Sequence, residues 1–152
     1  MTNVAKIVLL ALLMLPLLAL ANRPAPPAPV YQQTVAGYQV HFNVMPTSDL
    51  QPEVARRNNI SRSENLLLVN LHVRKDDGDG GLGEARRAEV TATARTLIGQ
   101  RREISLREID DGDTVYYIGT LRKTSGDRLI FDLNIKPEDA RRAFDVRFER
   151  DL

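Results

Sequence analysis

The sequence predicts an all-β fold, an antiparallel immunoglobulin-like β-sandwich of about seven strands with two short connecting helices. Three observations favour this fold class. Apolar residues recur at every second position in short runs, turn-forming residues separate these runs, and no long segment has the periodicity of a helix. Short strands with one apolar face are typical of such sandwiches, and a partly closed barrel is the alternative.

Six of the seven expected strands alternate apolar with polar side chains, so each presents one face to a core. They span residues 38–44, 67–73, 90–94, 104–106, 129–135 and 144–148. The seventh, residues 115–121, is apolar on both faces, as a strand covered on two sides would be. Phe131 lies on the apolar face of its strand, so we expect it in the core.

Two segments carry the signals of a short helix. Residues 52–57 and 137–142 each begin with proline, continue with an acidic residue and end on two arginines. We expect both to form short connecting helices. Residues 110–113 are expected to form a hairpin turn, in which Gly112 supplies the positive φ that such turns need.

Residues 1–21 have the organisation of a secretory signal peptide. Lys6 is their only charge, a continuous apolar run follows it, and Ala19 and Ala21 supply small residues two positions apart. We therefore expect cleavage between Ala21 and Asn22 and export of the mature chain. The alternative is an uncleaved membrane anchor, but a spanning helix needs about 20 apolar residues and this run is shorter and interrupted by proline.

The remainder is expected to be one tethered domain. Residues 22–34 hold four prolines, and we expect an extended proline-rich linker there. Residues 35–152 would then form a single β-sandwich domain, since no repeat or second hydrophobic block marks another one. The chain has no cysteine, which excludes disulfides, thiolate metal sites and a cysteine nucleophile.

The charge balance excludes a nucleic-acid binder. Without Lys6, 20 of the 21 basic residues remain and face 20 acidic ones, so the mature chain is formally neutral. Its arginine pairs are scattered among acidic residues, whereas nucleic-acid binding needs clustered cations. A membrane contact is expected only if the leader is retained.

The cofactor motifs fail on their context. Residues 78–83 match the spacing of a pyrophosphate-binding glycine loop, but a threonine-rich strand follows where that motif needs a helix. The aspartates of this segment do not fit a calcium loop either, because Gly81 and Leu82 occupy the positions of a ligand and of the obligatory glycine. We expect a hairpin loop here, with no cofactor and no metal ion.

Two histidines and two tyrosines are the best candidates for a binding surface. His41 and His72 lie on the less apolar faces of their strands, so both rings would share one face if the strands pair. Binding a metal would need a third ligand, and half-exposed strand histidines are the favoured interpretation. Tyr116 and Tyr117 must point to opposite faces, so one should enter the core and the other line the surface.

Seven segments occur in a fixed order along the chain: PEVA (52–55), ISRSEN (60–65), LVNL (68–71), ATARTLIGQ (92–100), REI (107–109), VYYI (115–118) and LIFD (129–132). Together they resemble an uncharacterised family of exported bacterial proteins, domain of unknown function 4426. The resemblance runs through most of residues 38–148. It implies a periplasmic β-rich domain of a Gram-negative bacterium, and it supplies no reaction, ligand or partner.

These observations favour a non-catalytic periplasmic binding or interaction module whose ligand or envelope partner is unknown. The second hypothesis is an envelope accessory protein held at the membrane by an uncleaved anchor. An enzyme comes third, because no nucleophile with its base and no metal triad can be assembled from the residues present.

The leader gives the first testable prediction. The exported protein should begin at Asn22 and fractionate with the soluble periplasmic proteins, because the small residues at positions 19 and 21 fit signal peptidase. Intact-mass spectrometry of the exported form checks this. A mass that includes residues 1–21, together with membrane fractionation, would favour the anchored hypothesis instead.

Overall fold

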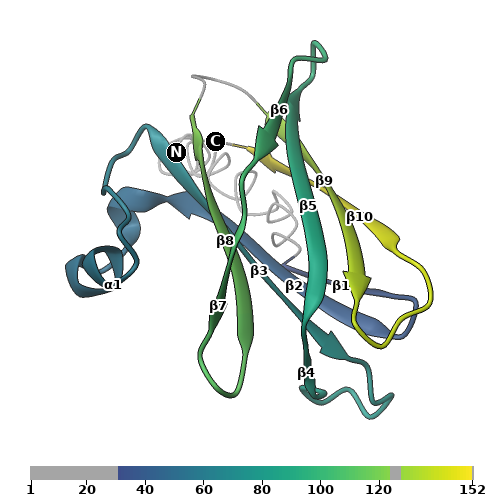
Figure 1. The fold of residues 1–152 in the computed structure, drawn as a ribbon. Coiled ribbons are helices and arrows are strands. Elements are labelled where there is room, and N and C mark those ends of the chain that lie inside the picture. Colours follow the sequence, from purple (N-terminus) through teal and green to yellow (C-terminus); the bar gives the residue numbers. More distant parts are fainter. Residues whose placement is uncertain (1–30, 124–127, 152) are drawn as a thin grey trace, which may run out of the picture.

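Two antiparallel β-sheets packed face to face make up the described part of the chain (Figure 1). The computed structural model describes residues 31–123 and 128–151. The expected leader and residues 22–30 of the expected linker lie outside this range. The all-β sandwich is confirmed, whereas the immunoglobulin-like strand order stays a prediction.

Sheet 1 has its strands in the order β1-β2-β3-β8-β7, and β4 pairs with one end of β3. They are β1 (Gln32–Val35), β2 (Tyr38–Pro46), β3 (Leu66–Lys75), β4 (Ala85–Arg86), β7 (Arg107–Asp110) and β8 (Val115–Arg122). Sheet 2 has the order β10-β9-β5-β6. Its strands are β5 (Ala88–Thr96), β6 (Arg101–Ile104), β9 (Arg128–Pro137) and β10 (Phe144–Asp151).

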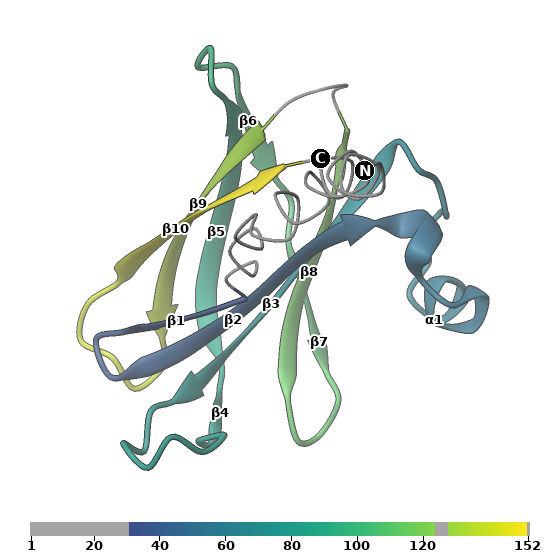
Figure 2. The same cartoon turned by 180° about the vertical axis from the view of Figure 1, so that it is seen from behind.

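The segment between β2 and β3 contains the first expected helix. A 3-10 turn, η1 (Thr47–Asp49), precedes α1 (Pro52–Arg57). The helix begins at the expected proline, and Asn59 beyond its end has a left-handed φ of 51°. Figures 1 and 2 show α1 on the side of sheet 1 that faces away from sheet 2.

The second expected helix, at residues 137–142, is wrong. β9 runs through Pro137, and a turn follows it, closed by a hydrogen bond from the Ala140 N–H to the Pro137 carbonyl at 3.0 Å. The tertiary structure decides this, because Tyr38 donates a hydrogen bond to Asp139 within the turn at 2.7 Å. The expected hairpin turn at residues 110–113 does form, and Gly112 has a φ of 83°.

Three strands were not predicted by the apolar alternation. β1 takes residues 32–34 from the expected linker, β4 is two residues long, and β7 pairs with β8. β6 also lies at residues 101–104 rather than 104–106. The side chains of β1 and β7 are mostly exposed, so they carry little apolar signal. Backbone pairing with a neighbouring strand is what makes them strands.

The core lies between the inner faces of the two sheets. Alternate residues of β2, β3 and β8 point into it from sheet 1, and alternate residues of β9 and β10 from sheet 2. At its centre Phe148 stacks on both Phe42 and Phe131, with ring centroids 4.0 and 4.9 Å apart. Phe42 belongs to sheet 1 and the other two rings to sheet 2, so this stack joins the sheets.

Ser105 and Leu106 carry the chain from β6 of sheet 2 to β7 of sheet 1, and this crossing segment passes over Gly119 of β8. A Cβ atom at this position would lie 2.7 Å from the carbonyl oxygen of Ser105 and 2.8 Å from Cγ2 of Ile104. Any side chain would therefore push the crossing segment off β8. Glycine at position 119 lets β6 lead directly into β7.

The glycine-rich segment after β3 forms the expected loop. Leu82 within it is 73% exposed and packs on nothing in the core. The end of the loop is nevertheless fixed, because Arg74 Nε donates to the Gly83 carbonyl at 2.6 Å. A Cβ atom on Gly83 would lie 1.6 Å from the carbonyl oxygen of Lys75, so this position requires glycine.

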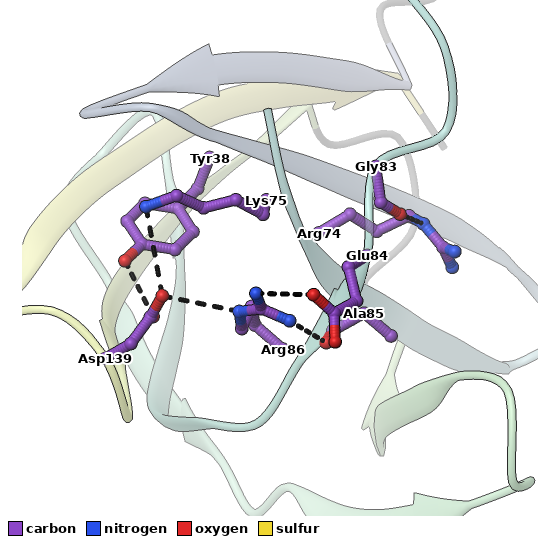
Figure 3. A network of polar contacts seen from close by, with 8 residues as sticks. All are labelled: Tyr38, Arg74, Lys75, Gly83, Glu84, Ala85, Arg86 and Asp139. Carbon is purple, nitrogen blue, oxygen red and sulfur yellow. Dashed lines mark hydrogen bonds and ion pairs between the residues drawn. The ribbon is translucent and has the colours of Figure 1, made fainter. Parts of the chain in front are cut away.

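A polar network joins the two sheets at one end of the sandwich (Figure 3). Asp139, in the turn after β9, accepts hydrogen bonds from Tyr38 of β2 and Arg86 of β4. Nζ of Lys75, in β3, lies 3.8 Å from Oδ2 of the same carboxylate. The hydrogen bond from Tyr38 holds the pKa of Asp139 below its ordinary value, and burial raises the pKa of Tyr38. One carboxylate of sheet 2 thus contacts three strands of sheet 1.

The aromatic stack gives the second prediction. Phe131→Ala should lower the free energy of unfolding by about 3–5 kcal/mol, because it removes a fully buried ring and leaves a cavity beside Phe148. Denaturant unfolding measures the change. Leu82→Ala is the control, since it removes an aliphatic side chain that is exposed. Equal midpoints for the two variants would show that the inner face has been assigned to the wrong side of β9.

Candidate functional site

The face of sheet 1 that points away from the core carries the candidate site. Because side chains alternate along a strand, the inward position of Phe42 places His41 and Asn43 on this outer face. Pairing of β2 with β3 sets His41 opposite His72 and Asn43 opposite Asn70. Pairing of β3 with β8 then sets His72 opposite Tyr116. We call this set, with the apolar residues described below, the outer-face site.

The outer-face site comprises two hollows that meet at Asn70. The first, of about 300 Å³, is lined by Tyr31, His41, Phe42, Asn43, Asn70 and His72, and we call it the polar hollow after its imidazole and amide groups, although carbon atoms make up much of its wall. The second, of about 330 Å³, lies against α1 and is mainly apolar. Its apolar lining consists of Met45, Leu50, Val54, Ile60, Leu68, Ile109, Tyr116 and Ile118, and Arg57, Asn58 and Asp111 line it as well. The imidazole and amide groups of the polar hollow thus adjoin an apolar trough.

The segment after β2 is held over the sheet by buried hydrogen bonds. The fully buried Thr47 hydroxyl lies 2.9 Å from the Ser61 carbonyl and 3.1 Å from the Ser63 carbonyl. Ala55 is the buried residue of α1, and its carbonyl accepts from the Ile60 N–H at 2.8 Å. Both ends of the loop are therefore fixed, so the wall of the apolar hollow is preorganised.

The two histidines form a stacked pair. Their ring centroids lie 4.5 Å apart with an interplanar angle of 11°, and the edge of Tyr116 meets His72 at 5.4 Å. Burial lowers the pKa of His72 from 6.5 to about 4, helped by the adjacent His41 and Arg74. Burial and then Arg74 also lower the pKa of His41. Both imidazoles are consequently neutral at pH 7, and the polar hollow carries no charge from them.

Two buried polar atoms of this hollow find no hydrogen-bond partner among the described residues. They are Nε2 of His41 and Oδ1 of Asn70. An unsatisfied buried polar atom costs about 1–3 kcal/mol, so native structures rarely retain one without a reason. Here both atoms belong to residues that line one hollow. This arrangement fits a bound molecule that supplies the missing hydrogen bonds.

The structure brings together three of the four residues singled out from the sequence. His41, His72 and Tyr116 meet on the outer face, because the two histidine strands pair, which was the condition for their rings to share a face. Tyr117 points inward and is buried. Its hydroxyl accepts from the Ala88 N–H at 2.7 Å, so Tyr117 belongs to the core rather than to the site.

Sequence reasoning missed the two asparagines and the apolar trough. Asn43 and Asn70 share the parity of the histidines in their strands, which was the available signal. The trough had no such signal, because α1, the residues on either side of it and the four strands β2, β3, β7 and β8 contribute to it. Its residues lie close together only after the sheet forms.

Within residues 31–123 and 128–151, no three His, Cys, Asp or Glu side chains are grouped so that they could hold a metal ion. The same ranges contain no helix of the length and hydropathy needed to cross a membrane.

Comparison with known proteins relates the chain to one family and two fold relatives. The family model of the domain of unknown function DUF4426 matches residues 32–152. The structure of a DUF4426 family protein from Pseudomonas aeruginosa PAO1 is 22% identical in sequence, with a TM-score of 0.66 over 80% of this chain and 92% of that chain. No curated protein matches the chain.

Two structures of FetP from uropathogenic Escherichia coli strain F11 have a similar fold. A copper-bound variant is 13% identical, with a TM-score of 0.57 over 79% of this chain and 92% of that chain. The protein as isolated, expressed in the periplasm, is 12% identical, with a TM-score of 0.58 over 82% and 93%. At these identities the likeness shows the fold alone.

The stacked histidines give the third prediction. Their pKa values are lower in the folded than in the unfolded chain, so between about pH 6.5 and pH 4 the unfolded chain binds more protons. The contribution of the two histidines to the free energy of unfolding should be complete above pH 6.5 and be lost as the pH falls. After a discount for partial exposure, the loss should be about 1–2 kcal/mol, measured by urea unfolding across this range.

The double variant His41→Gln, His72→Gln is the control for this pH dependence. It removes every histidine of the chain, so its stability should fall less than that of the wild type over the same pH range, and the loss that remains near pH 4 should come from carboxylates such as Asp139 whose pKa is lowered in the folded chain. If the wild type and the double variant lose stability in parallel, the stacked pair is not the cause.

Proposed function

The chain belongs to the family of the domain of unknown function DUF4426, and on that premise we propose that it is a non-catalytic binding module of the periplasm whose ligand lies in the outer-face site. The observation that carries this proposal is the pair of unsatisfied atoms, His41 Nε2 and Asn70 Oδ1, in one hollow. The expected leader and the periplasmic expression of one fold relative support the compartment.

The ligand is a small uncharged molecule with a polar head and an apolar body. Oδ1 of Asn70 only accepts, so the head must donate a hydrogen bond through a hydroxyl or an N–H group. The neutral histidines offer no counter-ion, which disfavours a charged head. The apolar body would lie in the trough beside α1, where Leu68 and Ile118 are already buried.

A shared metal ion fits the histidine pair less well than an organic ligand does. Copper is bound in the FetP variant, a protein of the same fold. In the present chain the rings of His41 and His72 stack face to face, so their nitrogen lone pairs point along parallel planes. One ring would have to rotate out of the stack before both nitrogens could contact one ion.

The fourth prediction tests the ligand chemistry with N-phenylnaphthylamine, an uncharged dye with aromatic rings and one N–H. The wild-type protein should bind it saturably, with increased fluorescence, and about tenfold more tightly than the N-methylated dye, which lacks the donor. Asn70→Leu should abolish this preference, because the acceptor is gone. The same substitution should raise the free energy of unfolding by about 1 kcal/mol, since it removes an unsatisfied buried polar atom.

Thr91→Ala is the matched control, because Thr91 is exposed on the outer face of sheet 2. It should keep the preference of the wild type for the N–H dye. The proposal fails if neither dye binds saturably, or if Asn70→Leu retains the preference.

A further inference from the structure

The turn between β5 and β6 exposes two adjacent aliphatic side chains. Leu97 is 67% exposed and Ile98 is 83% exposed. Together with Leu82 they are the most exposed large aliphatic residues of the described chain, and only these two are adjacent. We call Leu97 and Ile98 the apolar tip. Figure 1 shows this hairpin projecting at the end of the molecule opposite to β4.

Backbone geometry keeps the apolar tip in solvent. The Gly99 N–H donates to the Thr96 carbonyl at 3.0 Å, so Leu97 and Ile98 occupy the two corner positions of a β-turn. Gly99 has a φ of 86°, which ends the turn in the left-handed region. Corner side chains of a turn point away from the strands, so no rotamer returns them to the core.

The turn is also rigid. The Thr96 N–H donates to the Gln100 carbonyl at 2.9 Å, and the Thr96 hydroxyl accepts from the Gln100 N–H at 3.2 Å. With the turn hydrogen bond, three bonds fix five residues. The two aliphatic side chains are therefore held outward before any contact forms, which lowers the entropic cost of binding.

Basic residues lie behind the apolar tip. Arg101 is the first residue of β6, where it pairs with Arg95, and Arg102 follows it. Arg102 Nη1 donates to the carbonyl of Arg122 at 2.9 Å, which brings the end of β8 to the same place. Lys123 follows Arg122, so four cations stand at these strand ends beside Glu103, and strand pairing brings the ion pair of Arg128 and Asp151 to the same end.

In contrast to the sequence expectation that only a retained leader would contact a membrane, we propose that the apolar tip of the exported protein inserts reversibly into a lipid surface that bears anionic headgroups. Two aliphatic side chains on a convex turn can insert between the lipid headgroups as far as the acyl chains, because a fluid lipid surface needs no complementary shape. The cations behind them would lie at the level of the headgroups, and this combination of apolar insertion and basic residues is what interfacial membrane binding requires.

Flotation with two kinds of vesicle tests the proposal on the exported protein. The protein should float with vesicles of phosphatidylcholine and phosphatidylglycerol, and a smaller fraction of it should float with vesicles of phosphatidylcholine alone. The variant Leu97→Ser, Ile98→Ser should reduce binding about tenfold or more. The variant Arg101→Gln, Lys123→Gln should remove the preference for anionic vesicles, and added salt should do the same in the wild type.

Leu82→Ser is the matched control, because it replaces an equally exposed aliphatic residue on a different loop. It should bind vesicles like the wild type. The tip variant should also unfold at an unchanged temperature, which separates lost binding from lost folding. The proposal is overturned if neither vesicle retains the protein, if the tip variant binds like the wild type, or if a photo-crosslinker at position 98 labels protein and no lipid.

Discussion

The packing of the two inner sheet faces against each other is the constraint on which the other features depend. The stack of Phe148 on Phe42 and Phe131 packs the sheets together in a chain that has no cysteine for a disulfide. Each aromatic pair contributes about 0.5–1.5 kcal/mol beyond the area that it buries. A shift of one residue in β2 would turn Phe42 outward and bury His41, so the core determines which side chains reach the outer face.

The outer-face site departs from what that face of a sandwich normally carries. An exposed sheet face is usually a polar, solvated surface, whereas here α1 and its loop cover part of it and leave buried polar atoms unsatisfied. Such an arrangement lowers stability, and functional sites are where folded proteins tolerate that loss. The core and the Asp139 network stabilise the rest of the sandwich and so offset the stability that the unsatisfied polar atoms cost.

The fold relatives illustrate why the site has to be argued from its own residues. FetP and this chain share a sandwich at 12–13% identity, and a shared fold does not transfer a ligand between proteins. What distinguishes the present chain is local: an imidazole stack, two asparagines and an apolar trough on one face of sheet 1.

The sequence by itself determined the fold class and the facing of the strongly alternating strands, because neighbouring side chains of a strand point to opposite faces. It therefore placed Phe131 inside and allowed His41 and His72 to share a face. It also determined the family, through seven segments in a fixed order. It could not give β1 and β7, whose side chains are exposed, nor the turn at Asp139, where a helix signal yields to a hydrogen bond from Tyr38. Only the tertiary structure decided that Tyr116 faces the site and that α1 closes its apolar end. Those contacts join residues distant in sequence, and they exist only once β2, β3 and β8 have paired.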